Sequence, residues 1–269
     1  MTENDEFVLT SENYYSQEAN RRYMSVHQYL SFAGHMGVHG CEAKAMAELR
    51  GDYVQETTKP MLIGSYVDSY FEGTLPEFKL LHPEIFTQKG ELKSDFKRAE
   101  KMIERAEQDE LFMQTMSGQK QVIMTAYLFG CDWKIKMDSY LPGTAIVDLK
   151  TTSDLHGSWN VPEQGRVGVL DYWGYILQGA VYQKVVEINT GDILPVYFSF
   201  ITKEEEPDIE VVYVDQDSLD AALEEIAENM PSVLAVKNEE VKPARCGDSR
   251  CVYCRRTKKL TAPILYTEL

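Results

Sequence analysis

Hydrophobic and polar residues follow two different periods along this chain, and the change of period predicts its elements. Apolar residues three and four apart are typical of helices, whereas strict alternation is typical of strands. The helical spacing occurs within Ser16–Arg50 and over Lys59–Gly73, Glu91–Met116, Val169–Ile188 and Leu219–Met230. Alternation occurs over Gln119–Phe129, Trp133–Tyr140, Thr144–Thr152, Leu194–Thr202 and Ile209–Asp215. The predicted fold class is therefore mixed α/β (α+β), with one helix, three strands, a helix and a further strand at its centre.

Local signals at the segment ends refine this picture. Ser25 suits the N-cap of a helix that begins at Val26. Pro231 is expected to end the Leu219–Met230 helix, because proline interrupts helical hydrogen bonding. The stretch Thr151–Gly168 is expected to be a long loop of the kind that often has a function. Trp159 within it is expected to pack, with base stacking as the alternative.

Charged residues lie on the strands that flank the Leu141–Gly143 turn, which predicts a hairpin. Asp148 and Lys150 are two residues apart and so project from one face, while Leu149 faces the opposite side with the core. A buried carboxylate and ammonium are costly unless they bind something. Asp138, across the hairpin, would complete a pocket of oxygen ligands suited to Mg²⁺ or Mn²⁺.

These residues resemble the motif of a known superfamily. Asp138 followed by Asp148-Leu149-Lys150 resembles the bipartite motif of PD-(D/E)XK nucleases. Gln178 and Tyr182, four apart on one helical face, resemble the Q-x-x-x-Y motif of the RecB-like branch, which includes RecE-like phage recombination exonucleases. The segment Ile63–Asp68 resembles the helix that supplies a metal-binding His in that branch, although Asp68 stands at the His position. The resemblance covers roughly Glu12 to Arg256.

The resemblance implies a fold and an activity. It implies a restriction-endonuclease-like αβββαβ core with a mixed central sheet and N-terminal helices. It also implies that Mg²⁺ or Mn²⁺ binds Asp68, Asp138, Asp148 and the Leu149 carbonyl, and that Lys150 orients or helps deprotonate a water. Gln178 and Tyr182 would lie beside this site. An exodeoxyribonuclease VIII-like enzyme of this branch would degrade double-stranded DNA ends as a ring-shaped homo-oligomer, and a single-strand annealing protein would coat the product.

The five cysteines indicate a second metal site. Cys246, Cys251 and Cys254 have the compact spacing C-x₄-C-x₂-C, which suits metal thiolates. A tetrahedral site needs a fourth ligand, for which Cys41 is the candidate, whereas Cys131 is expected to be a buried strand residue. One N-terminal and three C-terminal cysteines resemble the iron–sulfur staple of AddB-type and CRISPR-adaptation nucleases. Four thiolates suit [4Fe–4S] or Zn²⁺, and free thiols are the alternative.

Composition bounds the domain organisation. A chain of 269 residues with 43% hydrophobic content suits one domain with a substantial core. Residues 1–15 are expected to form a flexible acidic arm, and residues 16–269 a single nuclease domain. Within that domain we expect a helical lobe over 16–58, a catalytic core over 59–215, and a helix with a Cys-rich tail over 216–269. Neither a membrane span nor a signal peptide is supported, so a cytoplasmic bacterial or phage-encoded protein is expected.

The net charge of −16 is unusual for a protein that binds nucleic acid. Basic residues nevertheless gather in two places, Lys89–Lys101 and Arg255–Lys259, and a local basic track on an acidic body can hold DNA. The sequence therefore predicts a metal-dependent DNA exonuclease that makes single strands for recombination. The alternatives are a structure-specific endonuclease with the same site and a catalytically inactive DNA-binding or assembly protein with this fold, which the Asp68 substitution and the charge favour.

Overall fold

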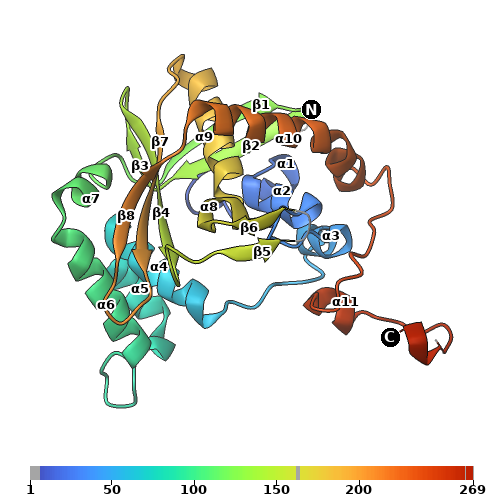
Figure 1. The fold of residues 1–269 in the computed structure, drawn as a ribbon, viewed down its shortest axis with the longest axis horizontal. Coiled ribbons are helices and arrows are strands. Elements are labelled where there is room, and N and C mark those ends of the chain that lie inside the picture. The colour runs from blue at the N-terminus through green and yellow to red at the C-terminus, as the bar shows by residue number, and fades with distance from the viewer. Residues whose placement is uncertain (1–6, 162–163, 264, 269) are drawn as a thin grey trace, which may run out of the picture.

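A mixed β-sheet forms the centre of the molecule, with helices on both of its faces (Figure 1). The computed structural model describes residues 7–161, 164–263 and 265–268. The four-stranded sheet has the order β3-β4-β7-β8, formed by Ser139–Leu141, Ala145–Thr152, Val196–Thr202 and Ile209–Tyr213. Strands β4 and β7 are parallel, and the outer pairs are antiparallel. The predicted mixed α/β class and its order of elements are confirmed.

A second antiparallel pair, β1 (Val122–Leu128) and β2 (Cys131–Met137), leads into this sheet. Phe129 and Gly130 both have positive φ, as a tight two-residue hairpin turn requires. The alternation pattern predicts one strand over Trp133–Tyr140, but the chain divides it at Asp138 into β2 and β3. Periodicity could not show this break, because the hydrophobic positions keep their spacing on both sides of it.

The sheet separates two hydrophobic cores. On one side, Ile146, Phe198 and Phe200 pack with α9 (Tyr175–Thr190). Helices α2 (Val26–Ala33), α3 (Glu42–Arg50) and α10 (Gln216–Lys237) complete this layer. On the other side, Val147, Leu149 and Ile201 pack with α4 (Lys59–Glu72), α6 (Ser94–Glu107) and α7 (Glu110–Thr115). The alternate positions of β4 therefore face different cores, as predicted.

Three predicted helices have different bounds in the structure. Glu91–Met116 consists of α6 and α7, because Asp109 caps a new helix by accepting a hydrogen bond from the Phe112 N–H (2.8 Å). Val169–Ile188 consists of α8 (Val169–Tyr172) and α9, divided at Gly174 with φ 71°. The predicted stop at Pro231 is wrong, since α10 continues to Lys237. Pro231 faces solvent, where water can satisfy the carbonyl that loses its partner, and the buried stripe continues beyond it.

The expected loop over Thr151–Gly168 contains a short hairpin, β5 (Trp159–Val161) and β6 (Gly165–Val167), and Pro162 lies outside the described residues. Trp159 stacks on Tyr172 with ring centroids 4.7 Å apart, so the packing role is confirmed. The remaining helices are α1 (Gln17–Arg22), α5 (Leu75–Leu81), α11 (Val252–Arg256) and the 3₁₀ turns Pro83–Ile85 and Tyr266–Glu268. Ser25 caps α2 as predicted, accepting from the Gln28 N–H.

The expected flexible arm, residues 1–15, is only partly described. Residues 1–6 lie outside the described residues. The last part of the arm is packed rather than loose: Tyr14 is 6% exposed, and its carbonyl accepts a hydrogen bond from the Lys134 ammonium of β2. Among the described helices, none combines the length and the apolar character needed to cross a bilayer.

Candidate active site and cysteine cluster

Strand β4 places Asp148 and Lys150 side by side on the face that packs against α9. Asp148 is only 3% exposed, and its Oδ2 forms an ion pair with the Lys150 Nζ. Val147 and Leu149 point into the opposite core. Two opposite charges in a buried position stabilise each other only when further hydrogen bonds complete their shells.

Helix α9 supplies those bonds. The Gln178 Nε2 donates to Asp148 Oδ1 (2.6 Å), and the Gln178 Oε1 accepts from Lys150 Nζ (2.9 Å). The ring of Tyr175 lies against the same ammonium, with Nζ 4.7 Å from its centroid, a cation–π contact. Tyr175 did not figure in the predicted site, although it is three residues before Gln178 and therefore on the same helical face.

Asp138 lies at the break between β2 and β3, where its carboxylate is free to face β4. Its Oδ2 accepts from the Leu149 N–H (2.9 Å) and its Oδ1 from the Gln121 Nε2 (3.1 Å). Gln121 has φ 53°, a conformation that non-glycine residues rarely adopt, and its Oε1 is buried without a hydrogen-bond partner among the described residues. Gln121 lies within the predicted strand Gln119–Phe129, but β1 begins only at Val122, so alternation did not single out Gln121 as a site residue.

Helix α4 brings Asp68 to the same place. A cleft is lined by Asp68, Glu72 and Asp138 together with Phe71, Met116, Gln121 and Leu149. Gly64 lets the helix approach β4, since a Cβ there would lie 3.1 Å from the Thr151 hydroxyl. Asp68 therefore points toward Asp138 rather than away from it, so the aspartate at the His position is placed to act as an oxygen ligand.

The electrostatics of this site favour a divalent cation. Burial raises the pKa of Asp148 to about 6, Asp138 adds to the rise, and Lys150 opposes it. Burial and the neighbouring Asp138 and Asp148 raise the pKa of Asp68 well above its ordinary value, while Lys150 again opposes the rise. One ammonium does not balance these carboxylates. A hard cation with oxygen ligands would, so the residues present fit Mg²⁺ or Mn²⁺.

Tyr182 lies one helical turn beyond Gln178 but serves a different contact. Its hydroxyl donates to the Lys136 carbonyl of β2 (3.1 Å), two residues before Asp138. Burial raises the pKa of this hydroxyl well above its ordinary value, so it stays protonated. In this arrangement Tyr182 supports the strand that carries Asp138.

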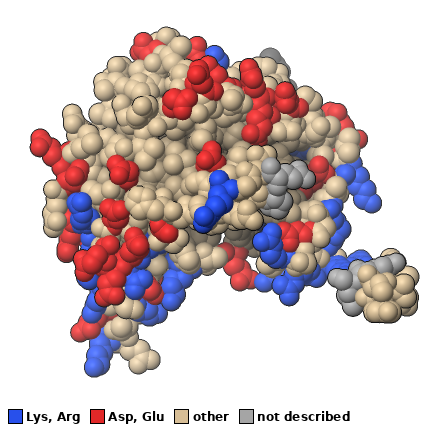
Figure 2. Space-filling view, in the orientation of Figure 1, with Lys and Arg blue, Asp and Glu red and all other residues tan. Residues whose placement is uncertain are grey.

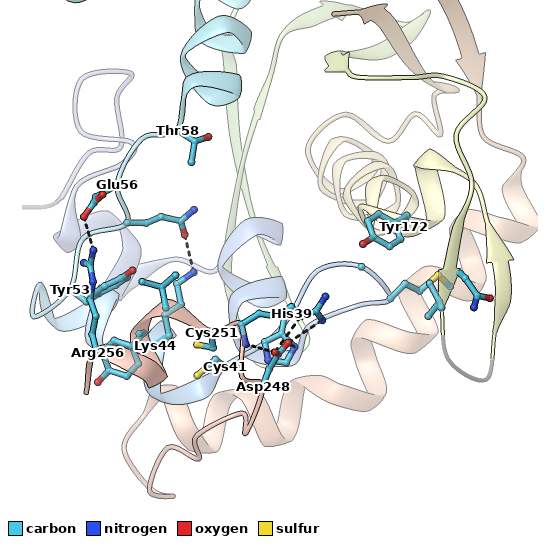
Figure 3. A pocket seen from close by; sticks show the side chains of 18 residues that line it. His39, Cys41, Lys44, Tyr53, Glu56, Thr58, Tyr172, Asp248, Cys251 and Arg256 are labelled. Carbon is cyan, nitrogen blue, oxygen red and sulfur yellow. Dashed lines mark hydrogen bonds and ion pairs between the residues drawn. The ribbon is translucent and has the colours of Figure 1, made fainter. Parts of the chain in front are cut away.

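The four predicted cysteines meet at a second place, where the start of α3 lies beside the C-terminal tail. The Sγ atoms of Cys41, Cys246, Cys251 and Cys254 all lie within 4.8 Å of one another. The Cys254 Sγ is 3.7 Å from the Cys41 and Cys246 Sγ atoms, too far for a disulfide. Cys41 is at the N-terminus of α3 and Cys251 caps α11 (Figure 3). Four thiols at this spacing could bind Zn²⁺ or an iron–sulfur cluster.

Other contacts fix this second site within the described structure. The Ala43 N–H donates to the Ala244 carbonyl (3.0 Å), so the tail runs beside the start of α3. Cys131 is half-buried on β2 and outside the cluster, and burial raises the pKa of its thiol to about 11. Among the described residues, the cluster is the only group of three or more His, Cys, Asp or Glu ligand atoms this compact. The carboxylates of the first site are therefore more widely spaced than the thiols.

A family comparison accounts for both the fold and the first site. Residues 25–257 match the model of a PDDEXK-like domain of unknown function (DUF3799). The chain belongs to this PDDEXK-like family. Its membership confirms the superfamily that the motif around Asp138 and Asp148 resembles, and PD-(D/E)XK nucleases generally use divalent metals.

The fold is shared with a solved structure. A crystal structure of a "Putative exonuclease" from Eubacterium rectale is 53% identical, covers 97% of this chain and 98% of its own, and superposes with a TM-score of 0.94. Another solved structure, SSO0001, is 12% identical over 72% of this chain and 85% of its own, with a TM-score of 0.29. No curated protein matches the sequence. The family and the first structure support a restriction-endonuclease-like fold and a nuclease.

Proposed function

We propose that the protein is a metal-dependent DNA exonuclease that hydrolyses phosphodiester bonds at the ends of linear duplexes. The observation that carries this proposal is that Asp68 of α4 and Asp138 line one cleft, while Asp148 and Lys150 of β4 form an ion pair close enough to shift the pKa of Asp68. A catalytically inactive DNA-binding protein would not need this costly arrangement of buried charges. The position of Asp68 in the cleft supports hydrolysis, because its carboxylate can supply an oxygen ligand where related nucleases have a His.

Asp68, Asp138, Asp148 and the Leu149 carbonyl would hold Mg²⁺ or Mn²⁺. When bound, such an ion polarises the scissile phosphate and lowers the pKa of a coordinated water. The chain's own residues prepare this site. The Leu149 N–H and Gln121 fix the carboxylate of Asp138, and Gln178 fixes that of Asp148. We assign Gln121 as a positioning residue for Asp138.

Lys150 would act as a fixed cation. Burial lowers the pKa of this ammonium, but Asp148, Tyr175 and Asp138 together outweigh burial and hold the pKa above its ordinary range. Lys150 is therefore protonated at neutral pH, so it can donate to an attacking water or to the negative charge that develops on the phosphate. Gln178 and Tyr175 hold the ammonium in place from α9.

The Eubacterium rectale relative is described as an exonuclease, and this supports action at DNA ends. The remaining details of the proposal come from the resemblance to phage recombination exonucleases. They are the production of single strands for recombination, a partner annealing protein, a ring-shaped oligomer, and a cytoplasmic location in a bacterium or phage-infected cell. The cysteine cluster would hold [4Fe–4S] or Zn²⁺ as a structural site that joins α3 to the tail.

The experiment that tests the proposal uses end-labelled linear duplex and a covalently closed circle, each with Mg²⁺ or Mn²⁺. We expect the linear DNA to be degraded from its ends, the circle to remain intact, and the Lys150→Ala protein to be inactive. Cleavage of the circle would replace the exonuclease with an endonuclease. Binding without metal-dependent cleavage of either DNA would establish the DNA-binding alternative.

A further inference from the structure

A hollow of about 830 Å³ lies beside the cysteine cluster, away from the cleft that contains Asp68 (Figure 3). Its wall is built from the α2–α3 connection, the linker before α4, strand β5 and the tail around α11. Nothing in the proposed hydrolytic mechanism uses this space. Its volume lies in the range of pockets that hold organic ligands of nucleotide size or larger.

The lining of the hollow combines aromatic rings with cations. Tyr53 and Tyr253 meet edge to face with centroids 5.3 Å apart, and both rings are only partly buried. Lys44 and Arg256 lie next to them, and Arg250 also lines the hollow. Aromatic faces for bases and cations for phosphates are the two components of single-strand binding sites.

A third tyrosine forms a fixed wall on the opposite side of the hollow. Tyr172 is stacked on Trp159 and lies so close to Gly37 that a Cβ there would be 2.2 Å from its ring. The Gly37 N–H also donates to the Tyr172 carbonyl (3.1 Å). The hollow is therefore rigid on this side, and the exposed stacking surface is on Tyr53 and Tyr253.

Two of the three cations of the hollow form exposed ion pairs, whereas the less exposed Lys44 donates to Gln55 Oε1 (2.8 Å) and lies 3.5 Å from Glu48 Oε1. Arg256 pairs with Glu56 (2.8 Å) and Arg250 with Asp248 (3.1 Å), and both guanidinium groups are more than half exposed. Exposed ion pairs of this kind contribute little to stability, so phosphate oxygens can replace the carboxylates at small cost. Residues 245–259 carry six Lys or Arg and a single acidic residue, in a chain whose net charge is −16.

The surface charge directs a polyanion toward this region. Acidic side chains cover the upper edge of the molecule, where α10 lies, and basic side chains are few there (Figure 2). Basic side chains gather on the lower part of the same face, including the region around α11. This asymmetry would steer DNA away from α10 and toward the hollow.

Helix α4 connects the hollow to the proposed site of hydrolysis. Thr58 lines the hollow and caps α4, and Asp68 lines the cleft ten residues further along that helix. Ten helical residues span about 15 Å. A stacked strand rises about 3.4 Å per nucleotide, so about four or five nucleotides would bridge the two places.

We propose that the hollow binds a segment of single-stranded DNA, with bases against Tyr53 and Tyr253 and phosphates beside Lys44, Arg250 and Arg256. Only unpaired bases can stack on these rings, because bases within a duplex are already stacked. This single-stranded segment would be continuous with the DNA molecule bound at the site of hydrolysis. The proposal rests on the proposed nuclease function and names a second contact for its substrate.

The test compares a blunt duplex with duplexes that carry a 5′ or a 3′ single-stranded overhang, using fluorescence anisotropy. All proteins carry Asp148→Asn, which prevents cleavage during the measurement. We expect an overhang to tighten binding by about tenfold or more, and the double variant Tyr53→Ala/Tyr253→Ala to lose that gain. Tyr213→Ala is the matched control, because Tyr213 is an exposed tyrosine on β8 outside the hollow.

Two single substitutions of exposed or partly exposed cations test the proposal even if the tyrosine double variant does not fold. Lys44→Gln and Arg256→Gln should each reduce the slope of log affinity against log salt by about 0.7 on the overhang substrate, and leave the blunt duplex unchanged. The proposal would be overturned if the tyrosine double variant still bound overhang duplexes more tightly than the blunt duplex. It would also be overturned if Lys44→Gln and Arg256→Gln left the slope of log affinity against log salt unchanged. Cleavage of blunt ends by proteins that retain Asp148 reports on the nuclease function separately. If that cleavage is absent from the unmodified protein, the proposed function fails, and the hollow proposal fails with it.

Discussion

The carboxylate site and the cysteine cluster bring metal-binding side chains together in opposite ways. Asp138 and Asp148 belong to one short stretch of chain on the central sheet, whose two cores hold them in place. The cysteines come from the buried start of α3 at residue 41 and from residues 246–254, on a loop and a helix of five residues. The carboxylates are spread out on rigid strands, whereas the thiols are tightly grouped and join a core helix to the C-terminal tail.

The central fold holds the carboxylate site in place, whereas the cysteine site helps to hold the C-terminal tail in place. The sheet and its hydrophobic cores would hold the carboxylates without a metal, at the cost of mutual repulsion. A helix as short as α11 is unstable alone, so its position depends on its contacts with the chain, namely the Tyr53–Tyr253 pair, the Arg256–Glu56 ion pair and the thiols with whatever binds them. Loss of the metal at the first site should therefore affect catalysis, and loss at the second should affect the order of the tail.

The largest expected effect is at the carboxylate site. Asp148→Asn keeps the shape of the side chain but removes a ligand charge, so the cleavage rate should fall by about 10³-fold, equivalent to several kcal/mol of transition-state stabilisation. The measurement is single-turnover cleavage of linear duplex, with circular dichroism to confirm folding. Normal cleavage by the variant, or inactivity caused by unfolding, would contradict a mainly catalytic role for the carboxylate site.

The second effect concerns the thiols. Cys251→Ser should release the bound metal, lower the free energy of unfolding by several kcal/mol, and expose residues 245–259 to protease, because the coordination holds α11 in place. Elemental analysis of the metal content and limited proteolysis measure these changes. Cys131→Ser is the control, since Cys131 is a cysteine outside the cluster. Equal metal loss in both variants would contradict a site made of these four thiols.

A substitution at Gln121 is expected to change protein stability and metal affinity at the carboxylate site in opposite directions. Gln121→Gly should relieve the cost of φ 53°, about 1 kcal/mol, yet weaken Mn²⁺ binding by about tenfold, because it removes the hydrogen bond to Asp138. Denaturant unfolding and Mn²⁺ titration by electron paramagnetic resonance give the two quantities. Glu239→Gly is the matched control: Glu239 has φ 64° at the end of α10, so only stability should change. Unchanged Mn²⁺ affinity in the Gln121 variant would remove its positioning role.

The pH dependence of the free energy of unfolding tests how strongly burial disfavours the ionised form of Asp148. The folded pKa is about 6 and the ordinary value is 3.8, so the proton stabilises the folded state, and this contribution is lost as pH rises through about 6. Without divalent metal, the free energy of unfolding should fall by about 1 kcal/mol between pH 5 and pH 7.5 from this group. Saturating Mg²⁺ should remove or reverse the trend, because the ion binds the deprotonated carboxylates. The measurement is urea unfolding of the unmodified protein and of Asp148→Asn at several pH values. The free energy of unfolding should change less with pH in the variant.

The smallest effect is expected at Tyr182. Tyr182→Phe removes the hydrogen bond to the Lys136 carbonyl and should lower the free energy of unfolding by about 1 kcal/mol, with only a few-fold loss of cleavage. Thermal unfolding and steady-state cleavage measure both. A loss of activity as large as that of Asp148→Asn would instead place the hydroxyl on the substrate.

The sequence predicts the parts of the site that follow a period. Alternation along β4 places Asp148 and Lys150 on one face, and helical spacing, with the family resemblance, places Gln178 beside them. The break at Asp138 depends on which residues pair across two strands, and the position of Gln121 depends on that break. No local pattern contains this information. Pro231 was misleading for a related reason: tertiary packing of the apolar stripe outweighs the cost of one missing hydrogen bond.

The meeting of Cys41 with the C-terminal cysteines also has a mechanical consequence. With a metal bound, the thiolates would close a loop of about 200 residues, within which the whole central sheet lies. A force applied to the C-terminus, such as the pull of a degradative unfoldase, would load the metal–sulfur bonds before it reached β7 and β8. The resistance of the protein to being unravelled from that end would then be set by the lifetime of the coordination bonds, and oxidation or chelation of the metal would control turnover without altering the core.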